Sequence, residues 1–310
     1  MTDKPFVVVI AGPTAVGKTE TALTVAEKFG MEIVNADSMQ VYRYMNIGTA
    51  KPNKEEQRRV RHHLIDVVNP DEHFDAGMYK KLADATIQDL WNRGVVPLIV
   101  GGTGLYIRVL MRGICGQIPR NESVLKKLKE KLKQRGISEL YGELTEVDPL
   151  LARRIHHHDR QRILRALEVY HSTGKPLSQW QEEHRFSDRP YRSLKIFLTR
   201  DRKELYERIN NRTEKMFRCG LVEEVQMLLE MGYSPELKSM QALGYKETVA
   251  YLHGHMSLDD AIRTVKKETR RYAKRQFTWF RKEPGFRWLE ASNTEKILNL
   301  VDGELQNAGV

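Results

Sequence analysis

The sequence predicts an α/β protein in which helices flank a mostly parallel sheet and a helical segment interrupts the order of strands. Three observations indicate this fold class. Short apolar runs alternate with amphipathic segments through the first third of the chain, a glycine-rich loop follows the first run, and strand-like runs disappear between about 112 and 187. Alternation of this kind is typical of parallel strands joined by crossover helices.

The strands are expected where four or more apolar residues, many of them β-branched, stand together. Taken in order, these runs are 6–11, 32–36, 63–68, 95–100, 194–199 and 286–291. The helices of the same domain are expected where apolar residues recur at helical spacing: 18–29, 75–93, 201–231, 240–253 and 258–282. After residue 291 we expect an exposed helix or tail. These elements assign 1–111 and 188–310 to the α/β core domain.

The segment between these parts predicts a helical insertion domain, 112–187. Helical patterns cover 121–135, 138–145 and 159–173, and Gly136, Pro149 and Gly174 separate or end them. Glycine and proline at such positions commonly end helices.

Composition excludes several classes of protein. The 310 residues are 40% hydrophobic and 30% charged, without an apolar run long enough to span a membrane. The apolar stretch near the N-terminus is too short for a signal peptide. Two cysteines, Cys115 and Cys219, cannot form a disulfide framework or a four-thiolate zinc site. We therefore expect reduced thiols and a cytoplasmic protein.

Charge is unevenly distributed along the chain. Residues 1–110 hold 13 basic and 13 acidic side chains, so the net charge of +10 belongs to the remaining 200 residues. A positive balance of this kind points to an acidic partner rather than to a fold.

A phosphate-binding loop is predicted at 12–19, where GPTAVGKT fits the pattern G-x-x-x-x-G-K-[ST] between an expected strand and an expected helix. Its residues are Gly12, Pro13, Thr14, Ala15, Val16, Gly17, Lys18 and Thr19. Backbone N–H groups of such a loop surround phosphate oxygens, Lys18 adds positive charge, and Thr19 offers a hydroxyl to Mg²⁺. The core is thus expected to be P-loop NTPase-like. The loop alone does not distinguish a nucleoside triphosphate such as ATP from another diphosphate.

Asp37 ends the segment EIVNAD after the second expected strand, at the sheet edge where ligands bind. It can act as a general base or as an indirect Mg²⁺ ligand. Alternatively, Asp37 or Ser38 caps a local turn. Asp66 invites a metal-ligand interpretation in the same way, but an aspartate in a turn after a strand is the commoner case.

A second glycine loop, GGTGLY, follows the strand at 95–100 and is expected to face the same pocket. Its glycines permit close backbone approach, which leaves the Thr103 hydroxyl free to donate to a phosphate or leaving-group oxygen. The alternative is a turn that needs glycine, with Thr103 as the helix N-cap.

Residues 263–282 contain nine basic side chains and one acid, Glu268. Seven of the cations fall on one side of the expected helix: Arg263, Lys266, Lys267, Arg270, Arg271, Lys274 and Arg275. Without neutralising partners they would repel one another unless a polyanion lies along them, which favours nucleic acid over a membrane. The basic runs at 120–135 and 153–165 agree with this interpretation.

Weaker signals remain. His156, His157 and His158 are consecutive, so on a helix their side chains would point about 100° apart and could not bind one metal. Arg208 and Arg212 lie one helical turn apart and could hold a phosphate, although surface ion pairs are the commoner use.

Taken together, GPTAVGKT, NADSMQVY, GGTGLY, QRILRALE, LYERINNR and AKRQFTWFRK resemble the tRNA dimethylallyltransferases, in order and over nearly the whole chain. The resemblance implies transfer of a dimethylallyl group from dimethylallyl diphosphate to N6 of the adenosine 3′ to the anticodon, in tRNAs that read codons beginning with U. Eukaryotic members carry a C-terminal zinc finger, which two distant cysteines cannot supply, so a bacterial type is expected.

The resemblance also implies a role for each matching residue. Asp37 would accept the N6 proton, the phosphate loop would hold the diphosphate, and Thr19 would hold Mg²⁺. Thr103 with Arg208 or Arg212 would stabilise the departing pyrophosphate. The residues implied to contact tRNA are Asp37, Ser38, Met39, Gln40, Lys126, Gln161, Arg162, Arg165, Arg270, Arg271, Lys274 and Arg275.

Two other functions stay open from the residues alone. A small-molecule or nucleoside kinase would use the phosphate loop with ATP, without needing the basic half of the chain. A non-catalytic RNA-binding P-loop protein would use a nucleotide only to regulate docking. We expect tRNA and dimethylallyl diphosphate as partners, no membrane, and a monomer.

Overall fold

The computed structural model describes residues 4–114, 118, 120–185 and 187–309; Cys115 lies outside this set. The chain forms two compact units, one of Met1–Met111 with Arg189–Val310 and the other of Arg112–Asp188. Sequence analysis placed the second boundary one residue earlier, after residue 187. No helix among the described residues is both long and apolar enough to cross a membrane.

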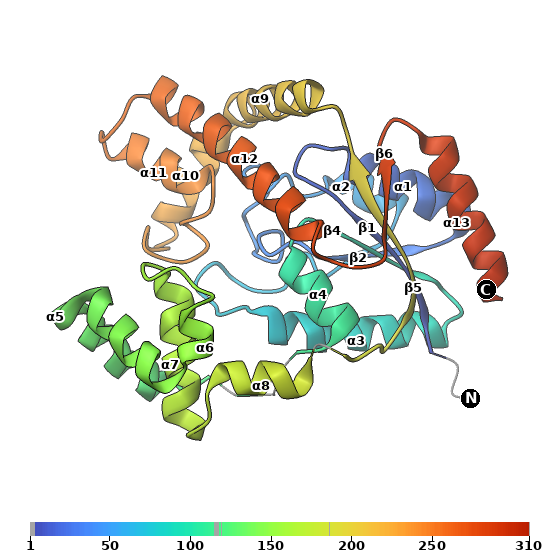
Figure 1. The fold of residues 1–310 in the computed structure, drawn as a ribbon. Coiled ribbons are helices and arrows are strands. Elements are labelled where there is room, and N and C mark those ends of the chain that lie inside the picture. Colours follow the sequence, from blue (N-terminus) through green and yellow to red (C-terminus); the bar gives the residue numbers. More distant parts are fainter. Residues whose placement is uncertain (1–3, 115–117, 119, 186, 310) are drawn as a thin grey trace. The chain divides into compact units, whose positions relative to one another are not determined.

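A six-stranded sheet organises the first unit in the order β3-β2-β4-β1-β5-β6, with every described pairing parallel (Figure 1). The strands are β1 Phe6–Ala11, β2 Glu32–Asn35, β3 His62–His63, β4 Pro97–Gly101, β5 Arg192–Thr199 and β6 Phe286–Glu290. Strand β1 is buried along its whole length, as a central strand covered on both faces must be. The predicted α/β fold class is confirmed.

Helices cover both faces of the sheet. They are α1 Lys18–Phe29, α2 Lys54–Arg59, α3 Ala76–Asn92, α4 Gly104–Arg112, α9 Arg202–Arg218, α10 Leu221–Glu230, α11 Tyr245–Leu252, α12 Leu258–Phe280 and α13 Thr294–Ala308. Figure 1 shows α3 and α4 along one face and α1 with α13 along the other. The side chains of Phe6, Val8 and Ile10 join a core that includes residues of α1, α9 and α13.

Three expected elements differ from the structure. The strand predicted at 63–68 is only β3, because Leu64 and Asp66 take positive φ angles of 60° and 53° that an extended strand cannot contain. The helix predicted at 201–231 is divided into α9 and α10 at Gly220, whose φ is 102°. The C-terminal segment is a helix that buries Ile297 and Val301, rather than an exposed one.

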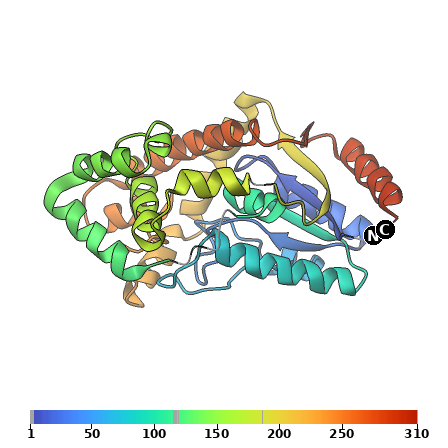
Figure 2. The same ribbon diagram turned by 60° about the horizontal axis from the view of Figure 1, so that its bottom comes forward.

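The second unit is helical throughout its described residues. Its helices are α5 Glu122–Val147, α6 Pro149–Ala152, α7 Arg160–Thr173 and α8 Leu177–His184. Gly136 interrupts α5 with φ 79° and ψ 177°, a conformation that is open essentially to glycine alone. Figure 2 shows the two arms of α5 meeting at this bend. Leu128, Leu140 and Ile163 contribute to the core of the unit.

Candidate active site

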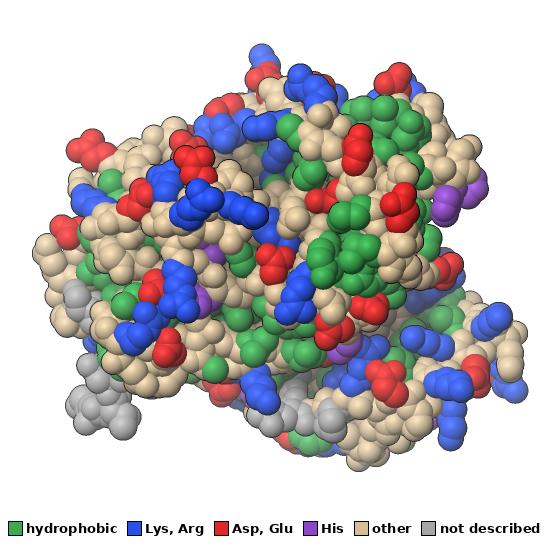
Figure 3. Space-filling model, turned by 180° about the vertical axis from the view of Figure 1, so that it is seen from behind, with side chains coloured by type: hydrophobic (Ala, Val, Ile, Leu, Met, Phe, Trp, Pro, Cys, Tyr) green, Lys and Arg blue, Asp and Glu red, His purple; other side chains and the backbone are tan. Residues whose placement is uncertain are grey.

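A cavity of about 1510 Å³ opens at the carboxyl ends of β1 and β2. Its wall comes from the phosphate loop, from parts of segment 37–57, from α9 and from α12. Figure 3 views the molecule from behind and shows Lys and Arg side chains at the margin of a hollow in its upper part. Because ligands of open parallel sheets bind beyond the strand ends, this cavity is the candidate active site.

The phosphate loop turns sharply before α1. Gly17 begins α1 with φ 112°, and Ala15 also takes a positive φ of 65°. The ammonium group of Lys18 donates to the carbonyls of Gly12 at 3.0 Å and Pro13 at 2.9 Å. Burial lowers the pKa of Lys18 to about 8, although Asp37 acts in the opposite direction.

Three arginines approach this loop from the end of β5 and from α9. Arg208 Nε donates to the Ala15 carbonyl at 3.0 Å, and Arg212 donates to the Thr14 hydroxyl. Arg200, which the sequence analysis did not single out, donates from Nε to the Val16 carbonyl at 3.2 Å. Its position directly after the expected strand at 194–199 was a signal that could have found it.

The charge around Arg212 is unusually concentrated. Burial lowers the pKa of Arg212, neighbouring Arg208 lowers it further, and Asp37 opposes both effects. Arg212 also contributes to the lowered pKa of Lys18. Cations crowded in this way gain from an anion that binds between them, which is the arrangement expected at a diphosphate site.

Asp37 lies on the cavity wall and also shapes its own turn. Its Oδ1 accepts from the N–H groups of Met39 at 2.8 Å and Gln40 at 3.4 Å. The capping interpretation and the general-base interpretation are therefore compatible, since both turn contacts are made by one carboxylate oxygen. The Gln40 amide donates to the carbonyls of Thr49 and Ala50 at 3.2 and 3.1 Å, so it also holds the neighbouring loop.

Thr103 connects the second glycine loop to this turn. Its hydroxyl oxygen accepts from the Ser38 N–H at 3.0 Å, and the hydroxyl donates to Ser38 Oγ at 3.3 Å. The phenol of Tyr272 lies beside Thr103, and burial raises the pKa of that phenol. The Thr103 side chain is thus aligned with the Asp37 turn.

The glycines of this second loop meet tightly packed neighbours. A Cβ on Gly101 would overlap the Ala36 backbone, and one on Gly104 would overlap the ring of Trp279. The requirement for glycine is therefore steric, which agrees with the turn interpretation.

Other polar residues of the site were not predicted. Lys51, with its side chain 2% exposed, pairs with Asp66 at 2.6 Å, so Asp66 already has a cationic partner. The buried carboxylate of Glu224 accepts from the N–H groups of residues 46–48 at 2.8–3.1 Å and from the Tyr245 hydroxyl at 2.6 Å. It fixes the loop that borders the cavity. Its backbone partners at 46–48 lie 176 to 178 residues away in sequence, beyond the reach of a local pattern.

The cationic side of α12 is partly neutralised, contrary to the expectation of an unpaired strip. Arg263 pairs with Asp260, Lys266 with Glu214 and Arg271 with Glu268. Arg270 donates to Asn210 at 2.6 Å. Lys267, Lys274 and Arg275 are exposed. Sequence counting missed the acids because Asp260 and Glu214 stand outside the counted segment.

Four candidate RNA contacts belong to the second unit. Lys126, Gln161 and Arg162 are exposed, and Arg162 pairs with Asp159 at 3.2 Å. Arg165 is more enclosed: it pairs with Glu168 at 3.0 Å and donates to the Ile118 carbonyl at 3.0 Å. Its contacts support the fold of the unit.

The helical geometry assumed for the three histidines was wrong. His156, His157 and His158 precede α7 instead of lying on a helix, and their candidate ligand atoms lie within 4.8 Å of one another. The rings of His156 and His157 stack at 4.3 Å. Because the segment is a turn, the helical angle of 100° does not apply.

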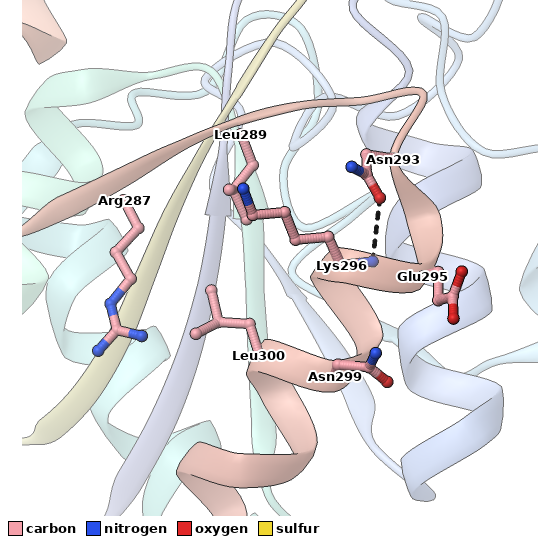
Figure 4. A pocket seen from close by; sticks show the side chains of 7 residues that line it. All are labelled: Arg287, Leu289, Asn293, Glu295, Lys296, Asn299 and Leu300. Carbon is pink, nitrogen blue, oxygen red and sulfur yellow. Dashed lines mark hydrogen bonds between the residues drawn. The ribbon is translucent and has the colours of Figure 1, made fainter.

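A second hollow, of about 620 Å³, lies between β6 and α13 (Figure 4). Its polar groups serve the fold: Asn293 Oδ1 accepts from the Lys296 N–H at 3.1 Å, and Arg287 pairs with Glu304. Glu295 points away from Leu289 and Leu300. Since its polar groups do not converge, this hollow is not the functional site.

The chain is similar to known proteins along most of its length. The family model for IPP transferase matches residues 40–283. A tRNA dimethylallyltransferase of Syntrophobacter fumaroxidans is 55% identical over 292 residues, 94% of this chain and 85% of that protein. Among solved structures, the full-length tRNA isopentenylpyrophosphate transferase of Bacillus halodurans is 38% identical, with 99% of this chain and 98% of that chain covered and a TM-score of 0.73. A eukaryotic dimethylallyltransferase acting on tRNA is 28% identical, with a TM-score of 0.84 over 98% of this chain and 80% of that one.

Proposed function

Because this chain belongs to the IPP transferase family of tRNA dimethylallyltransferases, it is a prenyltransferase, and we propose in detail which groups react and which residues act. The donor is dimethylallyl diphosphate. The acceptor is N6 of the adenosine 3′ to the anticodon in tRNAs that read codons beginning with U. The observation that carries this proposal is the convergence of Lys18, Arg212 and Asp37 in one cavity at the sheet edge.

The phosphate loop with its cations is suited to hold the diphosphate. Lys18 and Arg212 interact electrostatically with each other and with Asp37. A diphosphate would relieve the repulsion between the cations. As the bond between C1 of the dimethylallyl group and its oxygen breaks, the pyrophosphate takes the electron pair, and fixed positive charge stabilises it.

Asp37 is proposed to assist the acceptor. The N6 lone pair forms the new bond to C1, and the amine must then lose a proton. One Asp37 oxygen accepts the N–H groups of its own turn, which holds the carboxylate in place. The other oxygen is proposed to accept the proton, as a positioned general base.

Mg²⁺ is the proposed cofactor. Thr19 lines the cavity beside Lys18, and its hydroxyl together with diphosphate oxygens makes the all-oxygen donor set that Mg²⁺ prefers. When bound, the ion would neutralise charge on the leaving group. This chain's own contribution is to hold the diphosphate oxygens beside the Thr19 hydroxyl.

The RNA is proposed to lie along the cationic side of α12. Lys267, Lys274 and Arg275 are exposed on that helix, while Tyr272 and Gln276 from the same helix line the cavity. Phosphate contacts would position the RNA, and the target base, stacked in the anticodon loop, would be extruded toward the diphosphate.

The reaction is tested with purified protein, isotope-labelled dimethylallyl diphosphate, Mg²⁺ and unmodified tRNA, followed by nuclease digestion and mass spectrometry of the nucleosides. The expected product is labelled N6-dimethylallyladenosine. Release of phosphate from ATP with no label in the tRNA would contradict the proposal and favour a kinase. Transfer RNAs that read other codons serve as the matched control for the acceptor.

A further inference from the structure

Helix α12 has an inner side that contacts both glycine loops. Tyr272 lies beside Thr103, and four residues later Gln276 contacts residues of each loop. Trp279 packs against Gly104 and stacks on the guanidinium of Arg108 at 4.1 Å. Residues at this spacing share one side of a helix, opposite the exposed Lys267 and Lys274.

Gln276 makes the most specific of these contacts. Its side chain is buried, and Oε1 accepts from the Thr14 N–H at 2.9 Å while Nε2 donates to the Gly102 carbonyl at 2.9 Å. A neutral amide supplies an acceptor and a donor at one point. Glutamate would offer only acceptors, and methionine, of similar length, would leave both backbone groups without this partner.

The two backbone groups belong to loops with different tasks. Thr14 lies in the phosphate loop, where its hydroxyl accepts from Arg212. Gly102 directly precedes Thr103, whose hydroxyl is aligned with the Asp37 turn. The amide of Gln276 therefore fixes the separation between the loop that surrounds the diphosphate and the loop that carries Thr103.

We propose that Gln276 is a positioning residue: it holds the phosphate loop and the second glycine loop at the separation that a diphosphate requires, and it joins both to the helix that bears the exposed cations. This inference rests on the proposed function only for the identity of the organic substrate. The role in binding a diphosphate stands on the loop geometry alone.

Gly102 offers an independent way to disturb the same contact. A Cβ at this position would enter the space of the Gln276 amide nitrogen, and Gly102 does not have a positive φ. Gly102→Ala should therefore displace the amide without straining the backbone. If Gln276→Met folds poorly, this second variant keeps the proposal open to refutation.

The experiment measures the affinity for inorganic pyrophosphate with Mg²⁺ by calorimetry, which needs no turnover. Gln276→Met should weaken binding about tenfold, because a buried N–H and a carbonyl lose their partner. Gln276→Glu should weaken it more, because a carboxylate would face the Gly102 carbonyl. Thr278→Ala, on the exposed side of the same helix, is the matched control. In the double variant Gly102→Ala with Gln276→Met, the loss of binding free energy for pyrophosphate should be smaller than the sum of the two single losses.

Steady-state kinetics and RNA binding then separate positioning from stability. For Gln276→Met we expect a raised KM for dimethylallyl diphosphate, with the RNA Kd and the midpoint of thermal unfolding close to those of Thr278→Ala. Pyrophosphate affinity equal to that of the control would overturn the proposal. If Gln276→Met lowers the RNA affinity and the thermal midpoint together with the pyrophosphate affinity, the role is purely structural and the proposal is overturned. If pyrophosphate binding follows the prediction but no prenyl transfer occurs, the proposed reaction fails and this inference stands.

Discussion

The inner and outer sides of α12 hold their polar groups in different ways. On the inner side, Gln276 is buried, and each end of its amide has one backbone partner. On the outer side, Arg263 and Arg271 are 74% and 58% exposed and pair with acids three residues away on the same helix. The comparison separates the two tasks that we propose for this helix: buried groups with fixed partners set geometry for chemistry, and the exposed cations that remain unpaired in the described residues attract a polyanion.

The largest effect should come from the cavity, with Asp37→Asn. The amide keeps the shape of the side chain but cannot take the N6 proton, so kcat should fall about 10²- to 10⁴-fold. The RNA Kd should change less than twofold. Single-turnover transfer and a filter-binding assay measure the two quantities; kcat within threefold of the unaltered enzyme would remove Asp37 from the chemistry.

Arg212→Met should have the next largest effect, about 10²-fold in kcat/KM, because the leaving pyrophosphate loses a positioned cation. Arg208→Met should cost less, because Arg208 donates to a loop carbonyl while Arg212 shares the electrostatic environment of Lys18 and Asp37. Measuring both variants also decides between the two arginines. Equal losses of kcat/KM in the two variants would contradict the larger role that we infer for Arg212.

The pH dependence of diphosphate binding follows from Lys18, whose pKa is lowered to about 8. The protonated form attracts the anion, so affinity should be retained below pH 8 and should fall as the pH rises above it, by up to about tenfold per unit. Calorimetry with pyrophosphate between pH 6.5 and 9.5 measures this, and Lys18→Arg, which stays protonated, controls for ionisation of the ligand. The same slope in both proteins would contradict the assignment to Lys18.

The smallest effects should come from the outer side of α12. Lys274→Ala should reduce the slope of log K for RNA against log salt by somewhat less than one, as expected for the loss of one phosphate contact. Arg263→Ala should change it less, because Arg263 is already paired with Asp260. Fluorescence anisotropy with an anticodon stem-loop measures both, and an unchanged slope for Lys274→Ala would argue against this side as the RNA contact.

Local patterns predicted the parts of the fold that local physics determines. The predicted bounds of β1 and α1 match the structure, because a buried apolar run and a glycine loop followed by an amphipathic segment specify them without distant partners. The prediction of a strand at 63–68 was wrong because the chain turns at Leu64 and Asp66 through positive φ angles, which the local sequence pattern does not predict.

Prediction of the site had a similar limit. Motifs identified the residues that stand beside the strand ends, among them Lys18, Asp37 and Thr103. They could not identify Gln276, whose partners lie 262 and 174 residues away in sequence, or Glu224, whose backbone partners lie about 177 residues away. Glu214, which pairs with Lys266 from 52 residues away, was missed for the same reason. Pairings of this kind arise only when the fold brings distant elements together.

The division of tasks between the two sides of α12 is tested most directly by varying salt in the transfer reaction. Between 50 and 200 mM salt, the account predicts that the KM for tRNA rises by about an order of magnitude or more, because salt weakens the attraction between the exposed cations and the RNA phosphates. At saturating tRNA, kcat should change less than twofold, since the buried contacts are screened far less. A fall in kcat that parallels the loss of RNA affinity would contradict the account.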